Sequence, residues 1–458
     1  MPQPQPPGGR RDPGHAEIEG KLLSARWVVP VEPAGAVLEH HAVAVRDGVI
    51  EQVLPATEAS ARFAHYEQVA LPDHVLIPGL VNAHTHAAMA LMRGLGDDLP
   101  LMRWLEERMW PAERRHLSAD MVRDGTSLAC AEMLRAGITC FNDMYFFPEA
   151  ALEAALGASM RVALGLIVVD YATTYASDPD DYLRKGLALR DASREQPLVS
   201  FCFAPHAPYT VSDDTLRHVA TLAAELDLPV HLHLHETEAE IERSLAEHGV
   251  RPLERLRRLG LLGPGLIAVH AIHLEPHELE LLARHGCSVV HCPSSNLKLA
   301  SGFAPVYSML KNGINVALGT DGAASNNRLD VLTEMRTAAL LAKALARDAE
   351  ALPAHTALRA ATLGGARALG LGARIGSIEP GKRADLAAVA LRGPELVPCY
   401  DPVSHLVYAA GREHVTHVWV DGKLVVRDGA LAHSASGLDT RWQIWQNAFK
   451  GPPGSESE

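Results

Sequence analysis

The sequence has no apolar run close to the roughly 20 residues that a membrane-spanning helix needs, and its opening residues lack the apolar stretch of a signal peptide. It also has no dense lysine and arginine stripe that could neutralise a phosphate backbone. The 42 basic residues are outnumbered by 55 acidic ones, which leaves a formal charge of -13. We therefore expect a cytoplasmic protein that binds neither membranes nor nucleic acid.

Paired cysteine spacing is missing as well. The six cysteines are scattered, whereas small secreted domains that depend on disulfides carry them at regular spacings. With 47% hydrophobic and 21% charged residues among 458, the chain can bury a large core. We expect a globular protein with reduced and mostly buried cysteines.

The two ends of the chain have similar patterns. Residues 1–17 are rich in proline, glycine and glutamine, which predicts a disordered tail. Short strand-like runs separated by turn signals follow in 18–72 and reappear in 375–435. We expect these two ranges to form one small β-sandwich domain, with a C-terminal helix and tail in 436–458.

Residues 73–374 alternate strand-like runs with segments of helical periodicity, which is typical of repeated βα units. The candidate strands are HVLIPGLVN near residue 75, GITCFND near 138, RVALGLIVV from 161, LVSFCFAP from 198, LPVHLHLH from 228, GLIAVHA from 265, CSVVHCP from 287 and INVALGTDG from 314. Eight such strands predict a (β/α)8 TIM barrel of the α/β class.

Polar side chains gather where these strands end. They are His84, His86, His206, His233, Glu236, His270, His291 and Asp321. The carboxyl ends of the strands form the active face of such a barrel, and scattered structural histidines would not keep this register. The sequence therefore predicts a single site at that face.

A metal ion is the expected centre of this site. NAHTH places His84 and His86 on one face of a strand end, and His233 and Asp321 at other strand ends complete a set that leaves a position open for water. The segment VHLHLHET alternates His231, His233 and His235 on one face, so alternation alone does not choose among them. We interpret His231 and His235 as structural. The metallopeptidase pattern HExxH and the cytidine-deaminase pattern with PCxxC are both missing.

Several motifs together resemble the amidohydrolase superfamily, in particular its 5′-methylthioadenosine/S-adenosylhomocysteine deaminase branch. They are PGLVNAHTHAAM, DMYF, PHAPYT, HLHET, VHAIHL, VHCPSSNLKLASG and LGTDGAASNN, and the resemblance runs from about residue 20 to 432. It implies a metal-bearing (β/α)8 barrel with a β-sandwich built from both chain ends. It also implies a homo-oligomer, a dimer.

The resemblance further implies a role for each site residue. The metal ligands are His84, His86, His233 and Asp321, around one zinc ion per subunit, although Fe²⁺ or Ni²⁺ also suit such donors. Glu236 matches the carboxylate that shuttles a proton to the purine N1, Asp321 also accepts a proton, and His270 matches a histidine at the reacting water or the substrate. Glu113 in WPAE matches a carboxylate that binds the ribose hydroxyls, and His206 matches a substrate-binding imidazole.

The expected reaction is hydrolytic deamination of an adenine ring. A divalent metal lowers the pKa of its water from about 15.7 to about 7, so that hydroxide can attack C6. We expect 5′-methylthioadenosine as substrate, giving 5′-methylthioinosine and ammonia, and adenosine as a second substrate. S-adenosylhomocysteine should react less well, because Leu166 stands where relatives have an arginine for its carboxylate and Arg184 is only a loosely aligned second candidate.

Other interpretations remain open at this stage. The same metal set suits a guanine deaminase or an s-triazine hydrolase, and a non-catalytic scaffold is a remote alternative because all ligands are present. Among the neighbouring side chains, His273 is expected to pack or to support the site, and His291 and Asn296 to shape the pocket. Trp104 and Trp110 are interpreted as core rather than pocket wall, and Glu106 and Glu107 as a solvated helix face.

Overall fold

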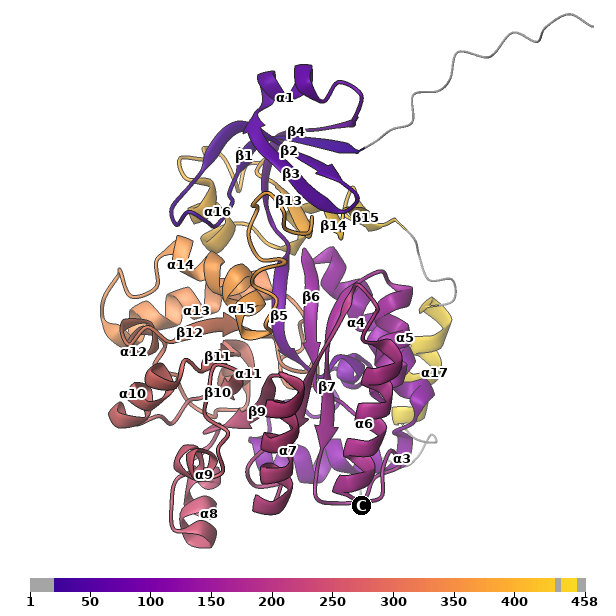
Figure 1. Ribbon diagram of the computed structural model, residues 1–458, viewed down its shortest axis with the longest axis vertical. Coiled ribbons are helices and arrows are strands. Elements are labelled where there is room, and N and C mark those ends of the chain that lie inside the picture. Colours follow the sequence, from indigo (N-terminus) through magenta and orange to yellow (C-terminus); the bar gives the residue numbers. More distant parts are fainter. Residues whose placement is uncertain (1–19, 433–437, 451–458) are drawn as a thin grey trace, which may run out of the picture.

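The computed structural model describes residues 20–432 and 438–450. It has a strand-rich part at one end and a helix-covered barrel below it (Figure 1). The tail expected at residues 1–17 lies outside the described residues.

The barrel consists of eight parallel strands that follow one another in chain order. They are β5 (Leu80–Thr85), β6 (Ile138–Asp143), β7 (Arg161–Val168), β8 (Val199–Pro205), β9 (Val230–Leu234), β10 (Leu266–His270), β11 (Ser288–His291) and β12 (Asn315–Leu318). The first and last strands meet through Asn82 and Thr320, which exchange two hydrogen bonds of 2.8 and 2.9 Å, and through the amide of Asp321, which donates to the carbonyl of His84 at 3.1 Å. The predicted barrel is confirmed.

Both chain ends contribute to a second, mixed sheet, as predicted. Its strands are β1 (Lys21–Val28), β2 (Leu38–Arg46), β3 (Val49–Pro55), β4 (Glu67–Pro78), β13 (Leu386–Ala390), β14 (Val415–Val420), β15 (Lys423–Arg427) and β16 (Ala430–Leu431). They hydrogen-bond as one sheet in the order β16-β15-β14-β13-β4-β1-β2-β3. Strand β4 joins the two ends, because it pairs in parallel with β1 and antiparallel with β13.

The first barrel strand differs from its prediction. The run HVLIPGLVN is not one strand: β4 ends at Pro78 in the mixed sheet and β5 begins at Leu80 in the barrel. Gly79 lies between them, where a Cβ atom would come within 2.1 Å of the Thr139 hydroxyl oxygen. Glycine therefore allows the chain to pass from one sheet into the other at this close approach.

Helices surround the barrel and cover its outer face (Figure 1). They include α4 (Ala119–Arg135), α5 (Pro148–Gly157), α6 (Pro179–Ser193), α7 (Asp213–Leu226), α8 (Glu238–His248), α9 (Pro252–Arg258), α10 (Pro276–His285), α11 (Pro293–Lys298), α12 (Val306–Lys311), α13 (Val331–Ala346), α14 (Ala354–Arg359), η3 (Ala360–Gly364) and α15 (Gly365–Ala368). Several begin at a side-chain cap: the Ser212 and Thr237 hydroxyls accept from the Thr215 and Glu240 amides, which fixes where α7 and α8 start. Helix α1 (Ala56–Arg62) packs on strands β1, β2 and β3 of the mixed sheet. Between β13 and β14 lie α16 (Pro402–Tyr408), which packs on α13 and α14, and η4 (Arg412–His414).

A long insertion follows β5. It contains η1 (Ala87–Met92), α2 (Leu101–Trp104), the π-helical turn η2 (Leu105–Met109) and α3 (Trp110–His116). The last three run on without a break, since the residues at their junctions keep helical backbone angles. We call this continuous stretch, residues 101–116, the wall helix. Helix α17 (Leu438–Lys450) packs on α4, where the Trp445 indole donates to Asp124 at 2.9 Å. Among the described helices, none has the length and apolar character that crossing a membrane requires.

A buried ion pair connects the barrel to the mixed sheet. The Arg161 side chain at the start of β7 is 2% exposed and donates two hydrogen bonds, of 2.8 and 2.9 Å, to Asp385. A third, of 3.2 Å, goes to Asp421. Replacing Arg161 by methionine would leave the buried Asp385 carboxylate unpaired.

We expect Arg161→Met to lower the free energy of unfolding by about 3–5 kcal/mol, the usual cost of removing one partner of a buried pair. Urea denaturation measures this as a lower transition midpoint. Arg194→Met, at a guanidinium that is 58% exposed, is the control and should leave the midpoint in place. Equal midpoints for the two variants would contradict the structural role of Arg161.

Candidate active site

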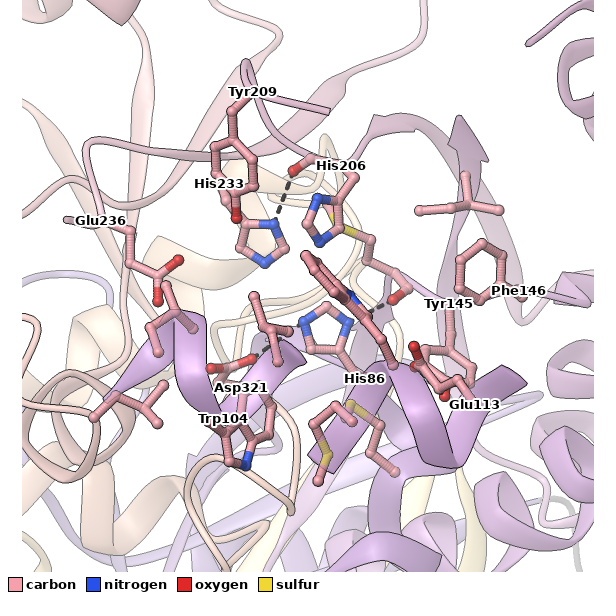
Figure 2. Close-up of a pocket in the computed structure, with 18 of the residues that line it drawn as sticks. His86, Trp104, Glu113, Tyr145, Phe146, His206, Tyr209, His233, Glu236 and Asp321 are labelled. Carbon is pink, nitrogen blue, oxygen red and sulfur yellow. Dashed lines mark hydrogen bonds and ion pairs between the residues drawn. The ribbon is translucent and has the colours of Figure 1, made fainter. Parts of the chain in front are cut away.

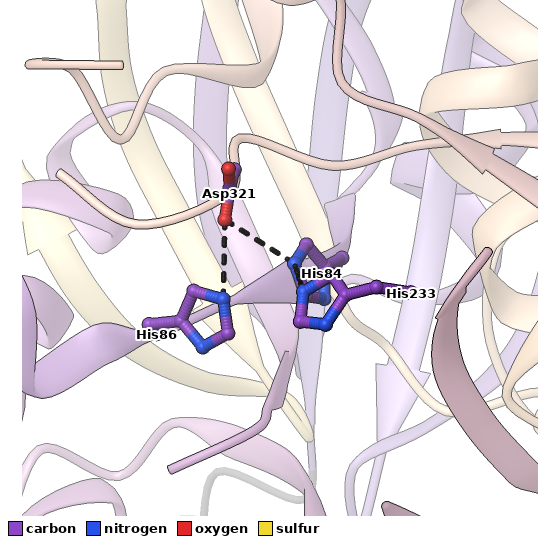
Figure 3. A group of neighbouring side chains, drawn as sticks. All are labelled: His84, His86, His233 and Asp321. Atoms are coloured by element: carbon purple, nitrogen blue, oxygen red, sulfur yellow. Dashed lines mark hydrogen bonds and ion pairs between the residues drawn. The ribbon is translucent and has the colours of Figure 1, made fainter. Parts of the chain in front are cut away.

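Four side chains converge where the barrel strands end. His84, His86, His233 and Asp321 each turn one ligand atom inward, and these atoms all lie within 4.8 Å of one another (Figure 3). The Nε2 atoms of His84 and His86 lie 3.3 and 3.2 Å from Asp321 Oδ1, and the Nε2 atoms of His84 and His233 lie 3.3 Å apart. The structure therefore brings together the four residues that the sequence predicted as metal ligands.

Hydrogen bonds to the outer ring nitrogens orient the three imidazoles. His86 Nδ1 lies 2.6 Å from the Met144 carbonyl and His233 Nδ1 lies 2.8 Å from the His206 carbonyl, so both Nδ1 atoms carry hydrogen. His84 Nδ1 lies 3.0 Å from Nε2 of His231. With Nδ1 occupied by an outer partner, each ring turns Nε2 toward the centre, as in metal sites.

Charge at the cluster also fits a cation. Burial tends to raise the pKa of Asp321, but hydrogen bonds from His84 and His86 outweigh it and hold that pKa well below its usual range. Burial tends to lower the pKa of His86, and the same Asp321 carboxylate instead raises it to about 9. Burial keeps the pKa of His233 well below its ordinary value, so this ring is neutral. A divalent metal ion would take the place of the proton that Asp321 holds on His86, so that one ionised carboxylate and three imidazole Nε2 atoms form its donor set.

Two serine hydroxyls hold the carboxylate of Asp321, one from α11 and one from the loop after β12. Its Oδ2 atom accepts from the Ser295 hydroxyl at 2.6 Å and from the Ser325 hydroxyl at 2.7 Å. The backbone of Asp321 has φ of 60°, a left-handed conformation that costs a non-glycine residue energy. His270, at the end of β10, has φ of 69°. Such backbone strain is concentrated at functional sites, where the surroundings maintain it.

Glu236 reaches the cluster from the loop after β9. Its backbone is fixed by Glu240, whose carboxylate accepts from the amides of Glu236 and His235 at 2.8 and 3.0 Å. The Glu236 side chain is buried, and burial raises its pKa above the ordinary value. A carboxyl group of this kind can hold a proton beside the ligands and donate it to a bound substrate.

His270 lies beside Glu236, with its Nε2 atom 3.8 Å from Glu236 Oε1. Its other nitrogen, Nδ1, lies 2.8 Å from Oδ1 of Asn296, which therefore orients the ring. Asn296 was predicted to shape the pocket, and it acts through this contact. His291 was expected to do the same, yet it ends β11 with its side chain buried and outside the residues that line the pocket.

A narrow pocket of about 80 Å³ leads to the cluster. Its apolar side comes largely from the wall helix and the strand ends, and includes Met89, Leu101, Trp104, Leu105, Met109, Trp110, Met144, Tyr145, Phe146, Ile167, Tyr171, Tyr209 and Leu299 (Figure 2). Trp104 belongs to the hydrophobic core, as interpreted, and also lines the pocket. Trp110 is half-buried and lines the pocket, so its interpretation as ordinary core is wrong. Glu106 and Glu107 are exposed, as expected.

Polar groups other than the cluster also line this pocket. Glu113, on the wall helix, accepts a hydrogen bond of 2.7 Å from the Tyr145 hydroxyl, and burial raises the pKa of this carboxyl group. His206 lies on the other side, where burial lowers its pKa to about 3. Figure 2 shows Glu113 and Tyr145 on one side of the pocket and Glu236 on the opposite side. The pocket thus has a hydrogen-bonding group at each end of an aromatic space.

Leu166 does not face this pocket. It is buried on β7 against helix α6, where a Cβ atom on Gly186 would lie 3.1 Å from its own Cβ, and the next residue, Ile167, lines the pocket instead. The argument that drew a substrate preference from Leu166 is therefore wrong in its geometry. Arg184, the second candidate, is 69% exposed on α6 and pairs with Asp181.

A wider cavity of about 870 Å³ adjoins the pocket and shares Trp110, Glu113, Phe146, Tyr171 and Tyr209 with it. Three arginines line this outer cavity. Arg255 is committed to Asp213 and two carbonyls, and Arg243 pairs with Glu247. Arg114 forms no ion pair with any residue in the described part of the chain. The outer cavity can therefore accept a long substituent that carries negative charge.

The remaining histidines have distinct structural roles. His235 turns away from the cluster and its Nε2 accepts from the Leu253 amide at 3.0 Å, in agreement with its structural interpretation. His273 Nε2 lies 2.8 Å from the Ser301 carbonyl, also outside the ligand set. His231, interpreted as structural, does more, because it is the hydrogen-bond partner of the metal-site residue His84.

Sequence reasoning gave no role to Tyr145, Tyr171 or Tyr209. A signal was present for all three, since Tyr145, Tyr171 and Tyr209 lie just past the ends of β6, β7 and β8. Residues at such positions face the active side of a barrel. The serines that hold Asp321 carried no comparable pattern.

The chain is similar to known proteins over most of its length. The model of the amidohydrolase family matches residues 75–425. A 5-methylthioadenosine/S-adenosylhomocysteine deaminase of Saccharophagus degradans is 49% identical over 431 residues, which cover 92% of this chain and 96% of the relative. A 5′-deoxyadenosine deaminase of Methanothermobacter thermautotrophicus is 44% identical over 357 residues, 78% of this chain and 83% of the relative.

A solved structure agrees with these relatives. The crystal structure of an adenosine deaminase from Xanthomonas campestris with bound zinc superposes with a TM-score of 0.93 at 51% identity, and the match covers 94% of this chain and 98% of the other. The chain therefore belongs to the amidohydrolase family, in its 5-methylthioadenosine/S-adenosylhomocysteine deaminase branch.

Proposed function

We propose that this protein is a zinc-dependent deaminase of adenine nucleosides, which converts 5′-methylthioadenosine to 5′-methylthioinosine and ammonia and also accepts adenosine and S-adenosylhomocysteine. The observation that carries the proposal is the position of the four-ligand cluster. It lies at the bottom of an aromatic pocket, with buried Glu236 on one side and the Glu113–Tyr145 pair on the other. The names of the similar proteins support the same substrate class.

His84, His86, His233 and Asp321 would hold the zinc ion, one per subunit. When bound there, a zinc ion lowers the pKa of a water molecule to about 7 and so supplies a nucleophile at neutral pH. The chain's own contribution at this point is orientation, because hydrogen bonds to Met144, His206 and His231 fix the rings.

Proton transfer would fall to two carboxyl groups. Glu236, kept protonated more readily by burial, donates to N1 of the adenine ring while C6 becomes tetrahedral. Asp321, held ionised, accepts a proton from the attacking water and passes it to the amino group, which leaves as ammonia. The hydroxyl group on C6 then returns a proton to Glu236 and becomes the carbonyl of the hypoxanthine ring. His270, oriented by Asn296, lies where it can hydrogen-bond to the oxygen that replaces the amino group.

The rest of the nucleoside would fit the rest of the pocket. Trp104 and Tyr209 offer flat apolar surfaces for the base. His206 can hydrogen-bond to the substrate, and Glu113 can bind the ribose hydroxyls, since it is the carboxylate at the junction with the outer cavity. The 5′ substituent would then extend into the outer cavity, where Arg114 is available for a carboxylate.

We expect Glu113→Gln to raise KM for nucleosides about 10- to 100-fold, because a hydrogen bond to a charged group contributes about 1.5–3 kcal/mol. The kcat value should change much less, since Glu113 lies away from the reacting carbon. Steady-state kinetics with 5′-methylthioadenosine measures both constants. Glu107→Gln, at an exposed carboxylate of the same wall helix, is the matched control. Unchanged KM in the Glu113 variant would contradict ribose binding there.

A guanine deaminase or an s-triazine hydrolase is the second candidate, because the same four ligands suit both. Glu113 favours a nucleoside over a free base, since a free base has no ribose hydroxyls for it to bind. The family resemblance also implies a cytoplasmic homodimer, which sedimentation of the purified protein tests independently of activity.

A substrate panel tests the proposal. Ammonia release and the ultraviolet change from adenine to hypoxanthine are followed with zinc-loaded protein and 5′-methylthioadenosine, adenosine, S-adenosylhomocysteine, adenine, guanine and a chlorotriazine. We expect turnover of the adenine nucleosides, with the highest kcat/KM for 5′-methylthioadenosine. Turnover of only the free bases or the triazine would contradict it.

A further inference from the structure

The wall helix leaves little room above the metal cluster. The inner pocket has about 80 Å³, whereas pockets for small-molecule ligands usually measure about 300–1,000 Å³. Six pocket residues, Leu101, Trp104, Leu105, Met109, Trp110 and Glu113, come from this one helix. Its position therefore decides how much space a substrate finds and which contacts it makes.

The segment that leads into the wall helix, residues 93–100, is bound at Asp97 by two polar side chains from elsewhere in the chain. Asp97 Oδ1 accepts from Lys298 Nζ at 2.6 Å, and Asp97 Oδ2 accepts from Asn327 Nδ2 at 2.8 Å. Lys298 Nζ also donates to Asn327 Oδ1 at 2.6 Å, which closes a triangle, and to the Ala324 carbonyl at 3.1 Å. We call Asp97, Lys298 and Asn327 the polar latch.

The latch connects the wall to the loops that hold the chemical groups. Lys298 ends α11, the helix that supplies Ser295 to Asp321 and Asn296 to His270. Asn327 follows β12 in the loop that supplies Ser325 to Asp321. Asp97 is thus the contact from the wall side, and Lys298 and Asn327 are the contacts from the catalytic side.

A displacement of Asp97 would shift the wall helix and with it the lining of the pocket. Gly96 packs against the wall helix, where an added Cβ atom would lie 2.8 Å from Cγ of Arg108 and 3.3 Å from Cδ1 of Trp104. Gly94, with φ of 76°, and Asp98, with φ of 64°, have left-handed backbone on either side of the latch residue. Residues 94–98 therefore form a short segment between two left-handed positions, and the latch binds this segment at Asp97.

Building on the proposed function, we infer that the polar latch of Asp97, Lys298 and Asn327 positions the wall helix over the pocket, so that Lys298 and Asp97 act as positioning residues for nucleoside binding. The latch lies at the rim, with the Lys298 and Asp97 side chains 20% and 39% exposed. It can therefore break and reform in contact with water as the wall opens for a substrate and closes on it.

The test compares Lys298→Met, Asp97→Asn and the double variant, with Lys311→Met, at an exposed lysine of α12, as control. Each single latch variant should raise KM for 5′-methylthioadenosine about tenfold, as expected for the loss of a charged hydrogen bond, with kcat and bound metal retained. The double variant should be less impaired than the sum of the two single variants, because both break the contact between Lys298 and Asp97. Additive effects, or an effect of Lys298→Met without one of Asp97→Asn, would overturn the inference.

Hydrogen exchange supplies a readout that does not depend on the substrate. Amides in residues 94–110 should exchange faster in both latch variants and remain unchanged in Lys311→Met. If no nucleoside is turned over but exchange rises as expected, the proposed function fails and the latch stands. Unchanged exchange in both latch variants would overturn the latch, whatever the activity.

Discussion

Replacing Glu236 by glutamine is expected to lower kcat for 5′-methylthioadenosine about 10²- to 10⁴-fold, the usual contribution of general acid catalysis. The amide has nearly the same shape as the carboxyl group but cannot transfer a proton to the adenine ring. Because burial raises the pKa of Glu236, the native side chain can keep a proton that glutamine cannot replace. Bound metal and KM should change little, since Glu236 lies outside the four-ligand cluster.

A neighbouring carboxylate provides the control for this variant. Glu238 lies two residues further along, exposed in the first turn of α8, so Glu238→Gln should retain full kcat. Steady-state kinetics measures kcat and KM of both variants, and metal analysis measures the metal that each one binds. A Glu236→Gln enzyme that retained its native kcat would remove this residue from the proton transfer.

Replacing His233 by alanine should abolish activity together with metal binding. The variant loses one of the imidazoles whose Nε2 atoms meet at the cluster, and its neighbours cannot substitute, because His231 is hydrogen-bonded to His84 and His235 turns toward Leu253. Metal analysis of the purified protein should find much less than one ion per chain, and ammonia release should fall below detection.

His277→Ala is the matched control, because this histidine is exposed on α10 and far in sequence from all four ligands. It should retain both metal and activity. If His233→Ala kept a full metal ion, the ligand set proposed here would be wrong, even with activity lost.

The site could be predicted from the sequence mainly because its polar residues lie at the ends of the barrel strands. In a parallel barrel the carboxyl ends of all strands meet at one face, so polar residues at those ends must converge, and the structure brings His84, His86, His233 and Asp321 within one cluster. Their individual orientation could not be predicted. It depends on partners such as the Met144 carbonyl and Ser325, which no spacing rule connects with the ligands.

The alternating histidines of β9 illustrate the limit. His231, His233 and His235 share a face in the sequence pattern, yet they differ in depth. His231 lies beneath the cluster against His84, His233 joins the cluster, and His235 lies beyond the last residue of β9, where φ of 54° redirects it. A period of two predicts a shared face, but where the strand ends is decided by tertiary structure.

The errors of prediction lie where the chain departs from regular repeats. Leu166 and Ile167 are neighbours on β7 and point to opposite faces, so a shift of one residue was enough to assign the wrong side chain to the pocket. Trp104 and Trp110 belong to an insertion that folds back over the barrel mouth, and an apolar pattern alone does not distinguish a pocket wall from a core. The passage of HVLIPGLVN through two sheets depends on a close approach at Gly79 that only the structure reveals.

The most direct test of the central claim is a metal titration. The protein is first stripped of metal with a chelator, and zinc is then added in steps while bound metal and deamination of 5′-methylthioadenosine are measured on the same samples. The proposed site predicts negligible activity at the start and a linear rise that ends at one zinc ion per chain. Full activity in the stripped protein, or none after one ion has bound, would contradict a metal-dependent nucleoside deaminase.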